Sequence, residues 1–363
     1  MQPGDAAPRT EQAAPVGQPA RTLIIGLGRA GLGLHWAVLR RLRATGRHTD
    51  LFDPAPVLTL DPVTPALPVA AEGLRHVSSL DQARTLLDPE RTVVHLCTPP
   101  VARLGLLREL AAAGFRRIVV EKPLASDRAS VREIVGLSRT EGLRLAVVAP
   151  WLASALTGRL ARLVDAGALG ALRSIEVRQY KPRMGRTLAD NGHPTAFDIE
   201  PPHSLGVCLR LAGPARLTGA ELADMRIGDT VVAGMGRAEL TLRHDTVTSR
   251  IVSDLTAPVR ERRIQLDFTD GQVVAHYPGA EDDHYAQLRI SRRGRPETWD
   301  VFPDDALSTY LLDTYRALRD GTDLAAQLHL ASRVVELLAD AKDLARRAVP
   351  AAGHTGQRVA RAG

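Results

Sequence analysis

The sequence contains few cysteines and few aromatic residues. Its two cysteines, Cys97 and Cys208, lie far apart inside apolar runs, which excludes a disulfide framework and indicates small buried thiols. Aromatic residues make up 4% of the 363 residues, whereas hydrophobic residues make up 44%. The core must therefore be built mostly from aliphatic side chains, which is typical of helices packed on a parallel sheet.

Long apolar runs and a secretory signal are also absent. No run reaches the roughly eighteen apolar residues of a membrane-spanning helix, and the first twenty residues lack a charged start followed by an apolar stretch. The formal charge is +6, but the arginines are scattered and few aromatics lie between them for base stacking. We expect a cytoplasmic protein with a small-molecule substrate, no nucleic-acid or membrane partner and no metal, with disordered ends at 1–20 and 348–363.

Lysine is the scarcest cation, with three lysines against forty-four arginines. One of them, Lys122, stands in Ile-Val-Val-Glu-Lys-Pro at 118–123. A guanidinium stays charged at any usable pH, whereas an amine can release its proton. Lys122 is therefore a candidate for proton chemistry or for a compact charge contact, and a structural salt bridge is the alternative.

Residues 21–150 alternate short apolar runs with helical patterns, which predicts an α/β domain with a Rossmann-type, doubly wound parallel sheet. We expect a Pro-rich loop at 54–68. The expected strands are 22–25, 50–52, 93–97, 118–120 and 143–148. The expected helices are 30–44, 102–113 and 127–141.

Residues 151–347 have a different pattern, which predicts an α+β domain with an open-faced, largely antiparallel sheet. A long loop is expected between 180 and 202. The expected strands are 172–180, 238–242, 248–253, 263–268 and 273–276, and the expected helices are 152–167, 203–212, 305–319 and 324–346.

The glycine-rich hexamer at 26–31 follows the first expected strand and opens a helix. In that context glycines permit a tight turn and close approach to a pyrophosphate at the helix N-terminus, so we expect a dinucleotide cofactor. Asp53, twenty-two residues after Gly31, is expected to end the second strand and to accept from ribose hydroxyls, which favours NAD. Arg29 leaves NADP open.

Two later motifs end strands at the same sheet edge. Cys97-Thr98-Pro99-Pro100 follows the strand at 93–97, and Glu121-Lys122-Pro123 follows the strand at 118–120. Parallel sheets bind ligands at their carboxyl edge, although a simple strand-ending turn is the alternative for the first motif. The candidate cofactor-binding residues are Gly26, Gly28, Arg29, Ala30, Gly31, Asp53, Thr98, Pro99, Glu121 and Lys122.

These motifs together resemble the Gfo/Idh/MocA family, named for glucose–fructose oxidoreductase, inositol dehydrogenase and a rhizopine-catabolism protein. The resemblance covers 22–346 and rests on the glycine hexamer, Thr98-Pro99-Pro100, the sequences at 111–114 and 167–170, and Glu121-Lys122-Pro123. It implies a dinucleotide domain followed by an open-faced sheet domain, and a homodimer or homotetramer formed through that sheet. Most members oxidise or reduce a hydroxyl or carbonyl on a sugar or cyclitol with NAD(P).

The resemblance also implies catalytic residues. Lys122 would lie between nicotinamide and substrate, where it polarises the reacting oxygen or relays its proton. The family's Asp-x-x-x-His element corresponds to 197–203, where His203 fits the acid/base histidine but Ile199 occupies the aspartate position. The carboxylate has moved to Glu200 or Asp198, or has lost its role. An ordinary helix-cap histidine is the alternative for His203.

A basic segment precedes this element, with Arg178, Lys181, Arg183 and Arg186 within nine residues. Such a group can hold a carboxylate or phosphate, and a solvated loop face is an equal alternative. Arg103 stands where many relatives have a histidine, which weakens any transfer of substrate identity. The candidate substrate-binding residues are Trp151, Tyr180, Lys181, Arg183, Asn191, His193 and His203, with packing as the alternative for the aromatic and loop residues.

The sequence therefore predicts an NAD(P)-dependent oxidoreductase. It would move a hydride between nicotinamide and a hydroxyl or keto carbon of a sugar, cyclitol or related small polar or anionic substrate. An imine or other carbonyl reductase on the same fold is one alternative, and a non-catalytic dinucleotide-sensing regulator is another. The high arginine content suggests a GC-rich bacterium and a role in secondary metabolism.

Overall fold

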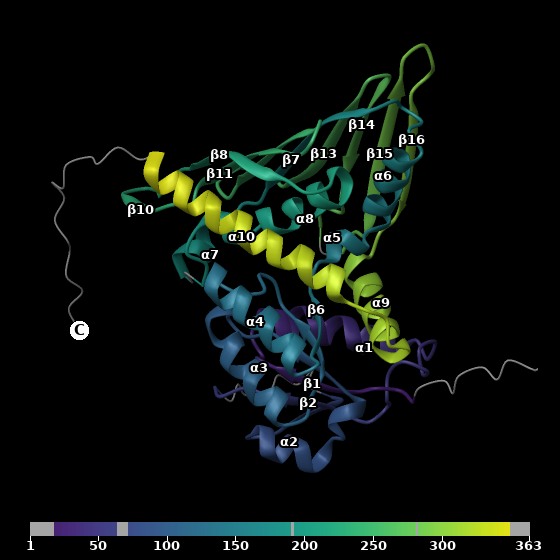
Figure 1. Cartoon of the computed structure of the whole chain (residues 1–363), viewed down its shortest axis with the longest axis vertical. Coiled ribbons are helices and arrows are strands. Elements are labelled where there is room, and N and C mark those ends of the chain that lie inside the picture. Colours follow the sequence, from purple (N-terminus) through teal and green to yellow (C-terminus); the bar gives the residue numbers. More distant parts are fainter. Residues whose placement is uncertain (1–17, 64–71, 190–191, 281, 349–363) are drawn as a thin grey trace, which may run out of the picture.

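The computed structural model describes residues 18–63, 72–189, 192–280 and 282–348, and it contains two large sheets joined by helices (Figure 1). The tail expected from residue 349 onward, most of the expected leader, and Asn191 lie outside the described residues. Ala20 is buried and pairs with Phe52, so ordered structure begins before the expected boundary at residue 21.

The first sheet is parallel and has six strands in the order β3-β2-β1-β4-β5-β6. This order is doubly wound, as the sequence predicted for the sheet. Its strands are β1 (Arg21–Ile25), β2 (Val57–Leu60), β3 (Leu74–His76), β4 (Thr92–Leu96), β5 (Arg117–Val120) and β6 (Arg144–Val147). Its connections contain π-helix η1 (Arg29–Trp36) and helices α1 (Ala37–Ala44), α2 (Leu80–Leu86), α3 (Arg103–Ala112) and α4 (Arg128–Thr140), with short turns η3 (Pro89–Arg91) and η4 (Pro100–Ala102).

The second strand was predicted wrongly. Residues 50–52 form a turn with one isolated bridge at Phe52, and the strand is β2, inside the segment expected to be a Pro-rich loop. Pro54 and Pro56 precede β2 and do not interrupt it, so the buried run at 57–60 keeps every backbone donor that the ladder needs. β3 and α2 were not predicted.

Each side of this sheet is buried, because its strands alternate side chains between two helical layers. Leu23, Val94 and Ile118 face the layer that contains α3 and α4. Ile24 and Val93 face the layer of α1 and of a helix from the far end of the chain, α9 (Ala306–Asp320). The N-terminal sheet is therefore completed by a segment nearly 300 residues away.

The second sheet has eight strands in the order β16-β15-β14-β13-β7-β12-β11-β8, and only the β7–β12 pair is parallel. The predicted strands at 172–180, 238–242, 248–253, 263–268 and 273–276 are confirmed. The strands are β7 (Leu172–Tyr180), β8 (Arg216–Leu222), β11 (Arg237–Arg243), β12 (Thr248–Asp254), β13 (Glu261–Phe268), β14 (Gly271–His276), β15 (Tyr285–Arg292) and β16 (Thr298–Pro303), beside a small ribbon of β9 (Met225–Ile227) and β10 (Thr230–Val232).

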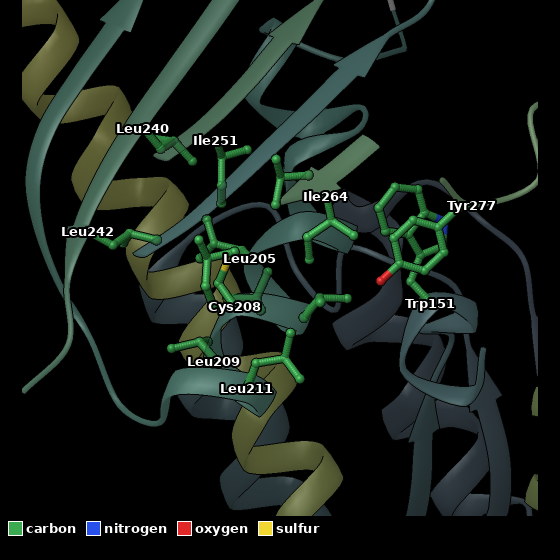
Figure 2. Close-up of a cluster of buried hydrophobic side chains, with 14 of the residues drawn as sticks. Trp151, Leu205, Cys208, Leu209, Leu211, Leu240, Leu242, Ile251, Ile264 and Tyr277 are labelled. Atoms are coloured by element: carbon green, nitrogen blue, oxygen red, sulfur yellow. The ribbon is translucent and has the colours of Figure 1, made fainter. Parts of the chain in front are cut away.

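One face of this sheet packs on helices and forms the larger core. Leu205 and Cys208 of α8 lie against Ile251 and Ile264 of the sheet (Figure 2). The helices of this region are α5 (Pro150–Ala153), α6 (Ala155–Asp165), α7 (Met184–Ala189), η5 (Ala196–Asp198) and α8 (Pro201–Ala212). α7 and η5 occupy what the sequence predicted to be a loop.

The last helix, α10 (Ala325–Ala348), runs between the two sheets (Figure 1). Leu328 and Val335 belong to the core of the first sheet, whereas Leu337 and Ala341 belong to the core of the second. α10 therefore fixes the two sheets relative to each other. No helix within the described ranges is long and apolar enough to cross a membrane.

Candidate active site

A cavity of about 1390 Å³ lies where the carboxyl ends of the parallel strands meet the second sheet region. The residues after β1, β2, β4 and β5 line one part of it, and the 181–203 segment lines another. Most candidates from the sequence line this cavity: Gly26, Gly28, Arg29, Ala30, Thr98, Pro99, Glu121, Lys122, Trp151, Lys181, Arg183, His193, Glu200 and His203. Gly31, Asp53 and Tyr180 do not.

The glycine turn fits a dinucleotide pyrophosphate. Gly28 lines the cavity, and a Cβ added there would meet no atom within 4 Å, so the backbone is open to a ligand. η1 begins at this turn with no side-chain cap and no acidic residue in its first turn. A Cβ at Gly31 would instead overlap the carbonyl oxygen of Gly26, so Gly31 is required for packing.

The acidic residue that follows the second strand and lines the cavity is Asp61, not Asp53. Asp53 accepts from the amide of Ala55 and lies 3.7 Å from Arg21, away from the cavity. Asp61 directly follows β2, lines the cavity, and accepts from the amide of Leu27 in the glycine turn at 2.6 Å. The expected place of Asp53 at the end of the second strand was wrong, because that strand was placed seven residues too early and Asp61 is the carboxylate that follows it.

The loops after β4 and β5 are tied together by Arg103. Its guanidinium donates to the carbonyl oxygen of Thr98 at 2.9 and 3.1 Å, and to that of Pro123. Burial lowers the pKa of Arg103 to about 10, although Glu121 opposes this. Thr98 Oγ1 is buried beside the cavity and has no hydrogen-bond partner among the described residues, which leaves it available to a bound group.

Lys122 projects from the end of β5 toward the second sheet region. Its Nζ donates to the carbonyl oxygen of Ile199 at 3.0 Å, and its amide donates to Glu121 Oε2 at 3.0 Å. Burial lowers the pKa of this amine, while the charges of Glu200 and Glu121 work against the decrease. The amine thus lies in a desolvated site where the charges of two carboxylates act on it.

All three lysines of the sequence converge on residues 198–200. Lys122 contacts the Ile199 carbonyl, Lys181 pairs with Glu200, and Lys342 of α10 pairs with Asp198. Asp198 also accepts from the amide and hydroxyl of Thr195, so it is a structural cap and does not line the cavity. Of the two carboxylates considered, Glu200 is the one that lines it.

Glu200 begins the helix that carries His203. Burial works against ionisation, but the charge and the hydrogen bond of Lys181 outweigh it and lower the pKa of Glu200 to about 2. Burial, together with the charge of Lys122, lowers the pKa of His203 to about 3. His203 is therefore a neutral imidazole at neutral pH, next to a charged Lys–Glu pair.

Aromatic rings form one wall of the cavity. Trp151 stacks on Tyr277 with ring centroids 3.9 Å apart, and on His203 with centroids 5.8 Å apart. Figure 2 shows the Trp151 and Tyr277 rings side by side at the edge of the hydrophobic core. Trp151 thus both packs against the core and lines the cavity. Tyr277, which was not predicted from the sequence, stacks on the Trp151 ring and supports its position.

The basic segment contributes three cations and a histidine to the cavity, namely Lys181, Arg183, Arg186 and His193. Arg178 instead pairs with Glu176 along β7. Arg260 and His284, from the loops before β13 and β15, and Arg262, at the start of β13, add to the same wall and were not predicted. The only sequence signal for Arg260 and Arg262 was their closeness to the start of a strand, which does not indicate where their side chains lie.

No family model matches the sequence. The chain is 27% identical over 272 residues to dTDP-3,4-didehydro-2,6-dideoxy-alpha-D-glucose 3-reductase from Streptomyces antibioticus, which covers 72% of this chain and 77% of that protein. A 3-ketoreductase from Actinomadura kijaniata, solved with NADP and TDP-benzene, matches with TM-score 0.73 and 16% identity over 90% of this chain and 98% of that one.

An NAD-binding oxidoreductase from Klebsiella pneumoniae matches with TM-score 0.71 and 14% identity, over 90% of this chain and 97% of that one. These likenesses extend over nearly the whole of both solved chains. The fold predicted from the sequence is therefore confirmed: a Rossmann sheet followed by an α+β domain, as in sugar 3-ketoreductases and NAD-binding oxidoreductases.

Proposed function

We propose that this protein is an NAD(P)-dependent reductase of a keto group on a nucleotide-linked deoxysugar. The observation that carries the proposal is that one cavity is lined by the glycine turn, by Lys122 and His203, and by a group of cations. We call this group, which consists of Lys181, Arg183, Arg260 and Arg262, the cationic wall. The 27% identical relative is a reductase of a dTDP-linked deoxysugar, which supports this substrate class.

The glycine turn and the strand-end loops form the cofactor side of the cavity. Gly28 and the uncapped start of η1 suit the pyrophosphate, and Asp61 stands where a ribose is recognised in such sheets. The bound nicotinamide nucleotide supplies the hydride. The protein must therefore hold the keto carbon close to it and manage the charge on oxygen.

Lys122 and His203 act on the reacting oxygen. As hydride reaches the carbonyl carbon, the oxygen gains an electron pair and must be stabilised and protonated. The Lys122 ammonium stabilises that oxyanion. The neutral His203 ring takes a proton from solvent and passes it to the same oxygen in reduction, and it takes the hydroxyl proton in the reverse direction. Glu200 and Lys181 form an ion pair next to these two residues, and their opposite charges compensate each other.

The cationic wall binds the anionic end of the substrate. This wall is lined by Lys181, Arg183, Arg260 and Arg262. A diphosphate needs such a group, because guanidinium and ammonium donors pair with phosphate oxygens. A neutral sugar or free cyclitol does not. This wall is the reason to favour a nucleotide-linked sugar over the cyclitol that the family resemblance also allowed.

The boundary at residue 150 and the oligomeric state are part of the proposal. We place the cofactor on 21–150 and the substrate contacts on 151–347, and we expect a homodimer or homotetramer. The end of the second sheet exposes Tyr285, Trp299 and Val301, which supports an interface there. Light scattering of the purified protein measures its mass, and a monomer at micromolar concentration would contradict this part.

The direct test is the loss of reduced-nicotinamide absorbance with dTDP-linked ketosugars, unlinked ketosugars, simple ketones and imines as substrates. We expect turnover of dTDP-linked ketosugars and at least about tenfold lower kcat/KM for the unlinked sugars, because the latter lack the diphosphate contacts. Cofactor binding without turnover across the whole panel would favour a dinucleotide-sensing regulator. Preferential turnover of imines would favour the other reductase class.

A further inference from the structure

A continuous line of buried polar side chains runs from the cavity through the first domain. Glu121 Oε1 lies 2.9 Å from His35 Nε2, and His35 Nδ1 lies 2.6 Å from His95 Nδ1. His95 Nε2 then lies 2.9 Å from the hydroxyl of Tyr315, which lies 2.8 Å from Thr22 Oγ1. Each of these five residues is less than 10% exposed.

The line crosses the layer between the first sheet and the helices that cover it. Thr22 and His95 belong to β1 and β4, His35 to η1, and Tyr315 to α9. Neighbouring positions on this face carry aliphatic side chains such as Ile24 and Val93. Polar groups in such a layer are costly unless every donor and acceptor is satisfied, so the pattern of hydrogen bonds is constrained.

Two proton arrangements satisfy all of these contacts with a charged Glu121. In one, both rings are neutral, and Thr22, Tyr315, His95 and His35 donate in turn toward the carboxylate. The raised pKa of His35 favours the other. In this second arrangement, His35 donates from Nε2 to the carboxylate and from Nδ1 to His95, so His35 is an imidazolium. His95 accepts on Nδ1 and donates from Nε2 to the Tyr315 hydroxyl, so His95 is neutral. Tyr315 donates in turn to Thr22. In this arrangement the donors diverge from His35, toward Glu121 at the cavity on one side and toward Thr22 on the other.

We propose that His35 and His95 are positioning residues for ketone reduction: they hold Glu121 as an oriented carboxylate, and Glu121 in turn fixes the position and charge of Lys122. The inference rests on the proposed function. Its geometric basis is the second oxygen of Glu121, Oε2, which accepts from the Lys122 amide at 3.0 Å. One carboxylate therefore joins the histidines to the residue that faces the reacting oxygen.

The charges around the line agree with this arrangement. Burial lowers the pKa of His35, but Cys97 and Glu121 outweigh it and raise the pKa to about 10. Burial and the neighbouring His35 charge lower the pKa of His95 well below its usual value. Burial raises the pKa of Glu121, but His35 outweighs this effect and the net pKa is lowered. Other charged or titratable groups that face this cluster are Lys122, Arg103, Tyr310 and Tyr315.

The sharpest test compares two isosteric replacements of His95. In His95→Asn, Oδ1 replaces the ring acceptor for His35. His95→Leu has the same shape but leaves the His35 N–H buried without an acceptor. We expect kcat to fall by about threefold or less in His95→Asn, and by about ten- to a hundredfold in His95→Leu, which corresponds to one orphaned buried donor. KM for the cofactor should change little in either variant.

A second readout does not depend on turnover. In protein labelled with ¹⁵N-histidine, we expect His35 to be an imidazolium in the wild type and in His95→Asn at about pH 8, and neutral in His95→Leu. The His35 signal is assigned by its loss in His35→Asn. Since the chain has only three lysines, labelled lysine gives three side-chain signals, and the Lys122 signal should move in His95→Leu while that of Lys342 stays.

Two controls separate positioning from stability. Ser332→Ala on α10 removes a buried hydroxyl that bonds to the Leu328 carbonyl, far from this line, and should lower Tm without changing kcat. A neutral His35 in the wild type would overturn the proposal. So would equal kcat in the two His95 variants, or an unmoved Lys122 signal. A wild type without reductase activity would overturn the proposed function instead, because the NMR readouts need no substrate.

Discussion

At the residue scale, the distribution of lysine separates amine chemistry from ordinary positive charge. The chain uses arginine for almost every cation, yet its three lysines all contact residues 198–200. A compact ammonium fits these partly buried positions, where a planar guanidinium would need more room and more acceptors. Residue type at Lys122, Lys181 and Lys342 is therefore set by local space and charge.

Replacement of either reacting side chain should abolish most turnover. We expect His203→Ala to lose about 10²- to 10⁴-fold in kcat while cofactor affinity is retained, because positioned acid–base groups contribute about that much. Lys122→Arg should also fail, since a guanidinium does not fit the contact with the Ile199 carbonyl and does not release a proton. Steady-state kinetics and cofactor titration measure both. Turnover like that of the wild type in either variant would contradict the assigned roles.

Burial of a neutral imidazole at His203 makes stability depend on pH. Its folded pKa of about 3 lies below the unfolded value of about 6.5, so below that value the unfolded state binds more protons and stability falls as pH decreases. The loss is at most about 1.4 kcal/mol per pH unit between about pH 6.5 and pH 3. His203→Gln should show a smaller decrease in Tm from pH 7 to pH 5. An equal decrease would indicate a charged or exposed ring.

The carboxylate at the end of β2 should influence the choice of cofactor. Asp61 lines the cavity, whereas Asp53 does not. We expect Asp61→Ala to raise KM for NADH and to lower the ratio of KM for NADPH to that for NADH, because a carboxylate there repels a 2′-phosphate. Asp53→Ala is the matched control, and both KM values should be unchanged. A shift in Asp53→Ala alone would restore the sequence-based assignment.

At the scale of elements, the start of α8 is held from two sides. Lys122 and Lys181 approach residues 199–200 from the cavity, and Lys342 of α10 pairs with Asp198 from the other side. Lys342 and Asp198 are 13% and 9% exposed at their side chains, so their pair is shielded from water. The position of His203 thus depends on a contact that lies outside the cavity.

Removal of this contact should reduce both stability and turnover. Lys342→Met leaves Asp198 without its cation, and the loss of one partner of a buried pair costs about 3–5 kcal/mol. The double variant with Asp198→Asn should recover part of that loss in denaturant unfolding. Arg346→Met on the same helix removes an exposed pair with Asp343 and should cost less than about 1 kcal/mol. Equal effects in the two single variants would show that the Lys342 pair is not shielded.

At the scale of the whole molecule, the chain does not divide into two independent cores at residue 150. Tyr310, Leu311 and Leu318 of α9 cover one face of the first sheet, and α10 packs against both sheets. A parallel sheet must be covered on both faces. The cofactor domain is therefore completed by the C-terminal helices.

A fragment of residues 18–150 should fail to fold alone. Without α9 it exposes the aliphatic face around Ile24 and Val93, and we expect aggregation or dye binding to exposed apolar surface. The full chain should unfold in one cooperative transition by calorimetry. A control fusion that joins 18–150 to 305–348 through a flexible linker should recover soluble, cofactor-binding protein. A cooperatively folded 18–150 fragment would show that α9 is dispensable.

The sequence by itself determined the elements whose signals are local. The glycine hexamer, the strand ends at Thr98 and Lys122, and the helix start before His203 were found because turn chemistry and periodicity act over a few residues. Most of the β strands of the second sheet were found for the same reason, since alternation with one buried face is visible in the chain.

The tertiary structure decided which distant groups meet. β2 was missed because flanking prolines hid a four-residue strand. The sequence therefore placed Asp53 at the end of the strand, where the structure has Asp61. The convergence of three lysines on 198–200 and the line from Glu121 to Thr22 join residues that are up to 293 positions apart at a single contact. Side-chain contacts at such separations follow from packing and desolvation, which the local pattern of a sequence does not encode.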